Sequence, residues 1–331
     1  MSDVVVGLDI HLKKTQVTVL RNDLIGEIVK RERVDTTKVG LRKSLESVPK
    51  GTKVALESVG FCWPWIDFLE DLGYEVLLAN PVKVKLRAED IKNDKVDSKT
   101  LAELVRMNWL PTCYVPPAEL RWLRSLLRHR AYRTRLSTSV RNRSSSEFRK
   151  RDIHLDVNLG TVKGRQEAFA LGVFEVNQNM ELLDLIVKQS KMVERMLWEK
   201  YGRVRPVELL MTIPGVGFLS ALTLYAEICD IGRFSSAEKL AHYAGLVPKV
   251  RQSGEHSNMG REVKGDKWLK SIFIEASWAH VRFCPGGHLA RVFADACLRK
   301  KSKTKAIKVV ARKLVNVVWC VWMNEEEFMV K

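Results

Sequence analysis

Residues 4–9 read Val4-Val5-Val6-Gly7-Leu8-Asp9, an apolar run that stops at an acidic residue. A short run of this kind predicts a buried β-strand. An acid that closes such a strand lies at the rim of the sheet, where ligands bind in α/β folds. Actin-like and sugar-kinase ATPases also open with a strand of the form Gly-x-Asp. The stretch therefore predicts an α/β domain and leaves its chemistry open.

The segments that follow Asp9 alternate between strand-like and helix-like patterns. The order β-β-β-α-β-α-β-α predicts a mixed sheet with helices on its faces, which matches a ribonuclease-H-like domain. We expect strands at 4–10, 16–20, 25–34, 53–56 and 74–78, a helix that starts at Thr36-Thr37, and helices at 62–72, 82–87 and 98–107.

Three further acids are candidates for the same rim. Glu57 ends the strand expected at 53–56, and if the two strands are neighbours, both carboxylates project at one edge. Asp94 and Asp97 lie beside the start of the helix expected at 98–107, and residues three apart share a helix face if that turn is helical. The structural alternative for Asp97 is a role at the helix N-terminus.

Four acids gathered in one place repel one another unless cations lie between them. Oxygen ligands with water in the remaining positions suit Mg²⁺. Two such ions about 4 Å apart would stabilise the attacking and leaving oxygens of a phosphodiester displacement. Asp9, Glu57, Asp94 and Asp97 together therefore predict a two-magnesium catalytic site. We interpret His11, Lys13 and Lys14, which follow Asp9, as ordinary residues of a variable loop without a role in the site.

The second half of the chain reads as mostly helical. Pro111 and Pro116-Pro117 mark a boundary, after which two long helices flank a polar loop at 142–164. This predicts an antiparallel coiled-coil arm, and such a pair often also dimerises. A compact, mostly α region follows from Val207. We expect a catalytic domain at 1–115, a basic coiled-coil arm at 116–205 and a C-terminal domain at 206–331.

A tight turn at Ile213-Pro214-Gly215-Val216-Gly217 separates two apolar stretches. The glycines let the backbone approach a ligand closely, and amides at the following helix N-terminus can hold a phosphate. The segment resembles a helix-hairpin-helix, which binds a DNA backbone without reading its sequence. An ordinary turn between two helices is the alternative.

The formal net charge is +17, and its excess is clustered. Residues 118–151 carry eleven basic residues against two acidic ones, and 299–313 carry eight basic residues and no acid. Clustering of this kind indicates a nucleic-acid partner rather than a solubilising surface. The candidate nucleic-acid-binding residues are Arg121, Arg124, Arg128, Arg133, Arg135, Gly215, Gly217, Lys305, Arg312 and Lys313.

Other features exclude several classes of protein. The six cysteines are scattered without CxxC spacing, so we expect reduced thiols and no zinc site. No apolar run is long enough for a membrane span, and the N-terminus lacks the pattern of a signal peptide. We therefore expect a cytoplasmic protein that has no membrane partner.

A series of motifs occurs in the order found in a known family. They are Val6-Gly7-Leu8-Asp9, Ala55-Leu56-Glu57-Ser58-Val59-Gly60, Asn80-Pro81, Asn93-Asp94-Lys95-Val96-Asp97-Ser98, Ile213-Pro214-Gly215-Val216-Gly217, Arg233-Phe234, Tyr243-Ala244-Gly245-Leu246-Val247-Pro248, Gln252-Ser253-Gly254, Lys264-Gly265-Asp266 and Ala311-Arg312-Lys313-Leu314. The chain resembles the DEDD-type transposases of insertion-sequence family 110, whose N-terminal domain is similar to the RuvC-type Holliday-junction resolvase. The resemblance runs from about residue 4 to residue 320.

The resemblance implies specific roles. Asp9, Glu57, Asp94 and Asp97 would hold the metal ions. Ser253 would attack a DNA phosphodiester and become linked to a DNA 5′ end through a phosphoserine. By chemistry alone Ser257 or Ser235-Ser236 would serve equally, and Ser253 is favoured by its neighbour Gly254 and its place after 245–248. The resemblance also implies a prokaryotic recombinase that acts at the nucleoid, with donor and target DNA bridged by a structured noncoding guide RNA, as a dimer or a tetramer.

Three other functions stay open from the sequence. A RuvC-type resolvase or nuclease would use the acids with water and would not need Ser253. An actin-fold ATPase would need a glycine-rich phosphate loop after Asp9, where residues 11–14 contain no glycine. A non-catalytic nucleic-acid-binding protein would need none of the acids.

Overall fold

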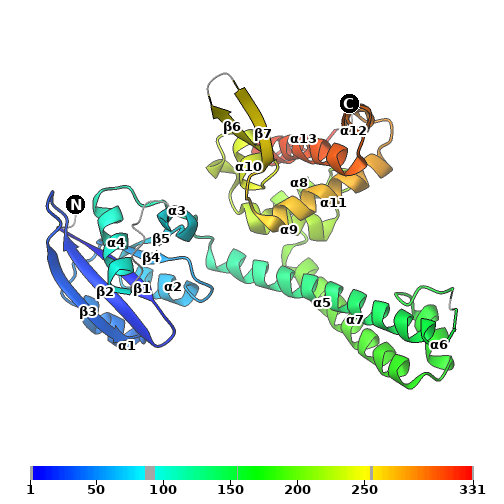
Figure 1. Ribbon diagram of the computed structural model, residues 1–331, viewed down its shortest axis with the longest axis horizontal. Coiled ribbons are helices and arrows are strands. Elements are labelled where there is room, and N and C mark those ends of the chain that lie inside the picture. Colours follow the sequence, from blue (N-terminus) through cyan, green and yellow to red (C-terminus); the bar gives the residue numbers. More distant parts are fainter. Residues whose placement is uncertain (1–2, 86–93, 155, 254–255, 330–331) are drawn as a thin grey trace. The chain divides into compact units, whose positions relative to one another are not determined.

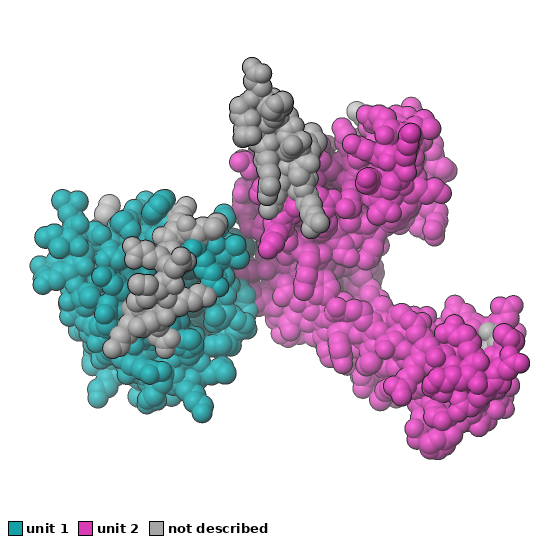
Figure 2. Space-filling view, in the orientation of Figure 1, with its two compact units in different colours: residues 1–115 teal, residues 116–331 magenta. Residues whose placement is uncertain are grey.

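The computed structural model describes residues 3–85, 94–154, 156–253 and 256–329 (Figure 1). The chain divides into two compact units, residues 1–115 and residues 116–331 (Figure 2). Each unit has its own hydrophobic core, and each is described by itself below.

Unit 1 is built on a five-stranded sheet in the order β3-β2-β1-β4-β5. β1 is antiparallel to β2 and parallel to β4, and β4 is parallel to β5, so the sheet is mixed, as the sequence predicts. This confirms the expected ribonuclease-H-like class. The strands are β1 (Val4–Ile10), β2 (Lys14–Arg21), β3 (Ile28–Asp35), β4 (Lys53–Glu57) and β5 (Glu75–Ala79).

Helices cover both faces of this sheet. Alternate residues of a strand point to opposite faces. Val6 and Leu8 therefore pack on the side of α1 (Lys38–Leu45) and α2 (Trp63–Asp71). Val5 packs on the other side against α4 (Asp94–Arg106). α3 (Pro81–Lys85) follows β5.

The first residues of α1 and α4 can be compared with the helix starts predicted from the sequence. The side chain of Thr37 accepts a hydrogen bond from the Gly40 amide at 3.0 Å, which confirms the expected start of α1. α4 begins at Asp94, four residues earlier than predicted, so Asp94 and Asp97 lie within its first turn.

Unit 2 begins with a helical arm. α5 (Ala118–Arg149) and α7 (Phe174–Tyr201) pack along each other, with α6 (Val162–Ala170) at the far end (Figure 1). The polar loop expected at 142–164 is therefore wrong for 142–149, which belong to α5, and for 162–164, which belong to α6. The Ser144 and Ser145 hydroxyls donate to Val140 and Arg141 carbonyls one turn earlier, at 3.0 Å each, so these serines are satisfied inside a helix. Burial of Phe148 adds a packing reason for the helix to continue.

The rest of unit 2 is mostly helical, as expected, and packs around residues such as Leu222, Phe273 and Leu314. It also contains a two-stranded sheet that the sequence reading missed. Its elements are α8 (Arg205–Met211), α9 (Phe218–Ile228), η1 (Ile231–Arg233), α10 (Ala237–Tyr243), β6 (Pro248–Ser253), β7 (His256–Glu262), α11 (Lys267–Phe283), α12 (His288–Lys300) and α13 (Lys303–Met323).

The described ranges bear on two expectations, one about the cysteines and one about membrane-spanning helices. None of the six cysteines forms a disulfide bond there. In the same part of the chain, every helix is too short or too polar to cross a lipid bilayer.

Candidate active site

Asp9 and Glu57 lie side by side at one edge of the unit 1 sheet. β1 and β4 run parallel, and Leu8 is paired with Leu56. Asp9 and Glu57 each follow directly, so both stand at the carboxyl ends of neighbouring strands. Because Leu8 and Leu56 face α1 and α2, the alternation of the strands turns both acids toward the face covered by α4. Asp9 is only 7% exposed, and Glu57 is half-buried.

The orientation of α4 brings two more acids to this edge. Near its end, the Arg106 guanidinium donates to the carbonyls of Asp23 and Leu24, which lie beside the start of β1. The helix therefore runs opposite to β1, and its first turn lies toward the carboxyl edge. Asp94 and Asp97 belong to that turn, and Asp97 is exposed. The side chain of Asp94 lies outside the described part of the chain.

His11 contacts the candidate site, a contact that its sequence pattern does not predict. Its Nε2 lies 3.1 Å from Oδ2 of Asp9, with 56% of the His11 side chain exposed and 10% of the Asp9 side chain. The contact is a hydrogen bond when the ring is neutral and an ion pair when it is protonated. A histidine two residues after a strand-ending aspartate was the sequence feature that could have suggested this contact.

The carboxylates supply the kind of ligand that magnesium takes. Asp9 and Glu57 offer oxygen donors at an open sheet edge, and a buried carboxylate beside a second acid favours a cation between them. Among the side chains that the structure describes, no group of three or more histidines, cysteines or acids is close enough to hold a metal ion. The Asp94 side chain is not among them.

Ser253 occupies the last position of β6. It is paired with His256 of β7, and two residues separate them in the chain. The side chain of Ser253 lies outside the described residues. A glycine within a two-residue connection is a hairpin signal, and Gly254 carried that signal in the sequence.

The base of the β6–β7 hairpin is attached to the helices around it. The Glu262 carboxylate accepts hydrogen bonds from Lys270 of α11 and from Lys308 of α13, the latter at 3.0 Å. Burial raises the pKa of Glu262, but the hydrogen bonds and charges of the two lysines outweigh it and lower the pKa. The Val263 amide also donates to the Val247 carbonyl at 2.9 Å.

The glycine turn at 213–217 has an internal role at one of its two glycines. Gly215 has φ +90°, and a Cβ there would lie 2.5 Å from the His280 amide nitrogen. The close backbone approach is thus to α11 within the protein, which gives Gly215 an internal packing role; its contact with a nucleic acid stays a prediction. Gly217 is exposed, precedes α9 and has open space around it. Its role at a phosphate likewise stays a prediction.

The arginines of α5 are divided between internal and exposed roles. Arg124 donates to the Ala226 and Glu227 carbonyls and is ion-paired with the buried Glu227 carboxylate at 3.0 Å. Arg128 pairs with the same carboxylate at 3.0 Å. The acid that pairs with these two arginines belongs to α9. The scarcity of acids within α5 therefore did not mean that its arginines lack partners. Arg121 and Arg133 are half-buried, and Arg135 is exposed.

The candidates on α13 are all at the surface. Lys305, Arg312 and Lys313 are exposed, whereas neighbours on the same helix such as Val310 and Leu314 are buried in the core of unit 2. This helix therefore presents a basic stripe to solvent.

Two family models match the chain. Residues 6–148 match a transposase model of the DEDD type named for IS110. Residues 207–290 match the model described as the transposase IS116/IS110/IS902 family. Both candidate sites fall within matched segments.

Similar proteins include several transposases. The transposase for insertion sequence element IS1328 of Yersinia enterocolitica is 24% identical over 277 residues, which cover 81% of this chain and 83% of that protein. The transposase for insertion sequence element IS1111A of Coxiella burnetii is 21% identical over 294 residues, 83% of this chain and 79% of that protein. The pilin gene-inverting protein of Moraxella bovis is 35% identical over 125 residues, 36% of this chain and 38% of that protein.

Proposed function

Because this chain belongs to the IS116/IS110/IS902 family of transposases, we propose that it cuts and rejoins DNA through a covalent phosphoserine at Ser253. The protein is a transposase of an insertion element, so its substrate is DNA. The proposal concerns the chemistry by which it acts.

The proposed reaction consists of two transesterifications. Ser253 Oγ loses its proton and bonds to the phosphorus, the bond from phosphorus to the 3′ oxygen breaks, and that oxygen leaves with a proton. The DNA 5′ phosphate stays on the serine. A 3′ hydroxyl of another strand then bonds to the same phosphorus and releases Ser253 with its proton. One ester bond forms for each that breaks, so rejoining needs no ATP.

Asp9, Glu57 and the first turn of α4 lie at the same edge of the unit 1 sheet. This observation supports a catalytic site built from the four acids. In our proposal two magnesium ions would be held by four acids: Asp9, Glu57, Asp94 and Asp97. Bound magnesium would neutralise charge on a phosphate oxygen and favour ionisation of a hydroxyl. His11 at 3.1 Å orients the Asp9 carboxylate. The tight burial of Asp9 limits the directions from which a ligand can reach it.

The acids and Ser253 belong to different units, so the proposed site needs both. Residues 1–115 would supply the acids, 116–205 a basic arm, and 206–331 the nucleophile. In a homo-oligomer, a dimer or a tetramer, the two parts can come from one chain or from two. Donor DNA, target DNA and a structured noncoding guide RNA would contact exposed cations such as Arg135, Lys305 and Arg312.

The test uses the full-length protein, its element's noncoding RNA, and DNA carrying the element junction, with the cleaved strand labelled at its 3′ end. We expect a protein–DNA adduct on a denaturing gel that requires Mg²⁺ and is absent from Ser253→Ala. Ser257→Ala, in the facing strand, is the matched control and should form the adduct. Asp9→Asn and Glu57→Gln should abolish it.

Two results would contradict the proposal. An adduct formed by Ser253→Ala would exclude this serine as the nucleophile. Cleavage by the wild-type protein that leaves free 5′-phosphate ends and no adduct would instead favour hydrolysis by water, as in a resolvase.

A further inference from the structure

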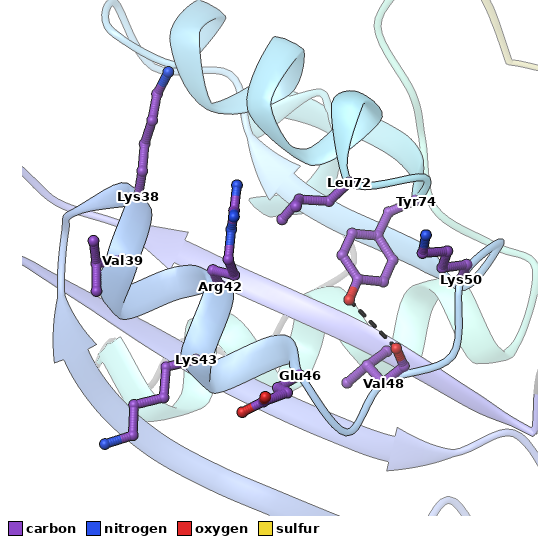
Figure 3. Close-up of a pocket in the computed structure, with 9 residues that line it drawn as sticks. All are labelled: Lys38, Val39, Arg42, Lys43, Glu46, Val48, Lys50, Leu72 and Tyr74. Carbon is purple, nitrogen blue, oxygen red and sulfur yellow. Dashed lines mark hydrogen bonds between the residues drawn. The ribbon is translucent and has the colours of Figure 1, made fainter.

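A groove on unit 1 lies outside the machinery proposed above. It has a volume of about 680 Å³ and is formed by α1, the segment after it and the end of α2 (Figure 3). Lys38, Arg42 and Lys50 stand around it, and Val48, Leu72 and Tyr74 form its apolar part. All of these residues belong to unit 1, so the groove does not depend on how the two units are placed.

The charge of the groove is strongly positive. Lys43 also lines it, and the only acid in the lining is Glu46. Within the described residues, no ion pair involves Lys38, Arg42, Lys43 or Lys50, in contrast to the paired Arg124 of the arm. Lys38 and Arg42 lie over the Phe68 ring, 5.6 Å and 5.9 Å from its centre, which positions these cations without neutralising them. Such a cluster favours an anion.

The apolar part of the groove narrows the choice of anion. The Tyr74 hydroxyl shares its proton between the carbonyls of Leu45 at 2.9 Å and Val48 at 3.3 Å, which fixes the ring in the groove wall. Figure 3 shows the contact with Val48. With its hydroxyl engaged, the residue presents its ring rather than a polar group. A free phosphate has no part that matches this surface. A duplex presents phosphates and sugars outward and keeps its bases stacked inside, so it does not match either.

The groove is also on the opposite side of the sheet from the carboxylates. α1 and α2 pack on the face of Val6 and Leu8, whereas Asp9 turns toward the face of α4. A ligand in the groove is therefore distinct from a DNA strand at Asp9.

We propose that this groove binds an unpaired nucleotide segment, with a base against Tyr74 and Leu72 and the flanking phosphates on Arg42, Lys50 and Lys38. Single-strand-binding proteins combine aromatic platforms and cationic grooves in this way. The phosphodiester and base could belong to RNA or to DNA, and the experiment separates the two. Binding here goes beyond the proposed strand-transfer reaction and does not require the Ser253 step.

Binding is measured by fluorescence anisotropy with the full-length protein in EDTA, so that metal-dependent contacts at Asp9 do not contribute. The probes are a 12-nucleotide oligo(dT), an oligo(U) of equal length, and a duplex of equal length. The variant is Arg42→Gln/Lys50→Gln. The matched control, Arg31→Gln/Lys53→Gln, removes the same charge from exposed residues outside the groove.

We expect the groove variant to bind a single strand on the order of tenfold more weakly. The slope of the logarithm of affinity against the logarithm of salt concentration should be smaller by about 1.4, because each of two lost phosphate contacts on a single strand contributes about 0.7. The control should change affinity less than about twofold, and duplex binding should be affected no more by the groove variant than by the control. If the loss is confined to oligo(U) or to oligo(dT), that result identifies the natural ligand as RNA or as DNA.

Photo-crosslinking gives a second readout that does not rely on a folded variant. Single strands carrying 5-iodouracil should crosslink to the peptide that contains Tyr74 in the wild-type protein, as mapped by mass spectrometry. Equal affinity of the groove variant and the control, or crosslinks that omit this peptide, would overturn the proposal. Neither outcome bears on adduct formation at Ser253.

Discussion

Gly7 lies directly against the backbone of Ser98, so β1 and α4 touch with no side chain between them. A Cβ on Gly7 would be 2.0 Å from the Ser98 carbonyl oxygen and 2.7 Å from the Ala102 amide nitrogen. The hydroxyls of Thr18 and Ser98 share a buried hydrogen bond of 2.8 Å at the same place. These contacts fix the distance between the strand that carries Asp9 and the helix that begins with Asp94.

Gly7→Ala should therefore damage both stability and catalysis. The added methyl group meets backbone atoms that cannot rotate away, so α4 has to move off the sheet. We expect a loss of about 3 kcal/mol or more in the free energy of unfolding, and loss of Mg²⁺-dependent cleavage because the first turn of α4 shifts with the helix. Thermal unfolding and the DNA cleavage assay measure the two effects.

Gly60→Ala is the control for Gly7→Ala, because a Cβ at Gly60 would meet nothing within 4 Å. It should unfold within a few degrees of the wild-type protein. Equal unfolding temperatures for the two variants would show that α4 does not depend on the missing Cβ of Gly7.

The two glycines of the 213–217 turn should respond differently to alanine. Gly215→Ala combines a positive φ with a Cβ 2.5 Å from the His280 backbone nitrogen, and we expect it to cost about 2 to 4 kcal/mol of stability. Gly217→Ala places its methyl group in open space and should unfold at nearly the wild-type temperature. Chemical denaturation of both variants checks this, and a similar loss for both would refute the internal role assigned to Gly215.

Arg124 and Arg135 lie on the same helix but should affect different properties. Arg124→Ala removes one of the two cations that pair with Glu227, whose side chain is only 2% exposed. The variant should lose about 3 kcal/mol in the free energy of unfolding. Arg135→Ala removes an exposed side chain and should change stability by less than about 0.5 kcal/mol. If Arg135 contacts a phosphate, this variant lowers the salt slope of nucleic-acid binding by about 1. A stable Arg124→Ala protein would contradict the structural role.

The attachment of Glu262 to Lys270 and Lys308 should make part of the stability depend on pH. The pKa of Glu262 is lowered in the folded protein, so the contribution is fully present above the unfolded-state pKa and is lost as the pH falls through the folded pKa. Glu262→Gln should cost about 1 kcal/mol near pH 7. The difference from the wild-type protein should shrink below about pH 4.3, the ordinary pKa of a glutamate. Unfolding curves at several pH values measure this, and a constant difference would argue against an ionic attachment.

The sequence predicted unit 1 well because its periodicities are local. The strand at residues 4–10 and the cap at Thr37 follow from side-chain order alone. The adjacency of Asp9 and Glu57 required the parallel pairing of β1 with β4, which the element order predicts only as a class of sheet. The contact of His11 with Asp9 depends on how the chain turns after β1, and a residue pattern does not specify that path.

Unit 2 was harder to predict, and the reasons differ from one segment to the next. Ser144 and Ser145 read as a loop, yet they bond to carbonyls of their own helix. Arg124 read as a free cation, yet its acid Glu227 is about a hundred residues away. The β6–β7 hairpin, whose first strand ends at Ser253, was missed because its strands are polar and form a small sheet of their own. For Arg124 a tertiary contact decided the role of the side chain, whereas the serines and the hairpin depend on local hydrogen bonds that their polar composition conceals.

The sheet of unit 1 separates the α4 face from the face of α1 and α2, and this arrangement has a consequence for the order of events. A strand held at Asp9 and a segment held beside Tyr74 would be on opposite sides of a continuous hydrogen-bonded layer. Neither would have to pass the other to enter or leave. A molecule bound at the groove could therefore stay in place through successive rounds of exchange at the other face, which would make its residence time independent of turnover.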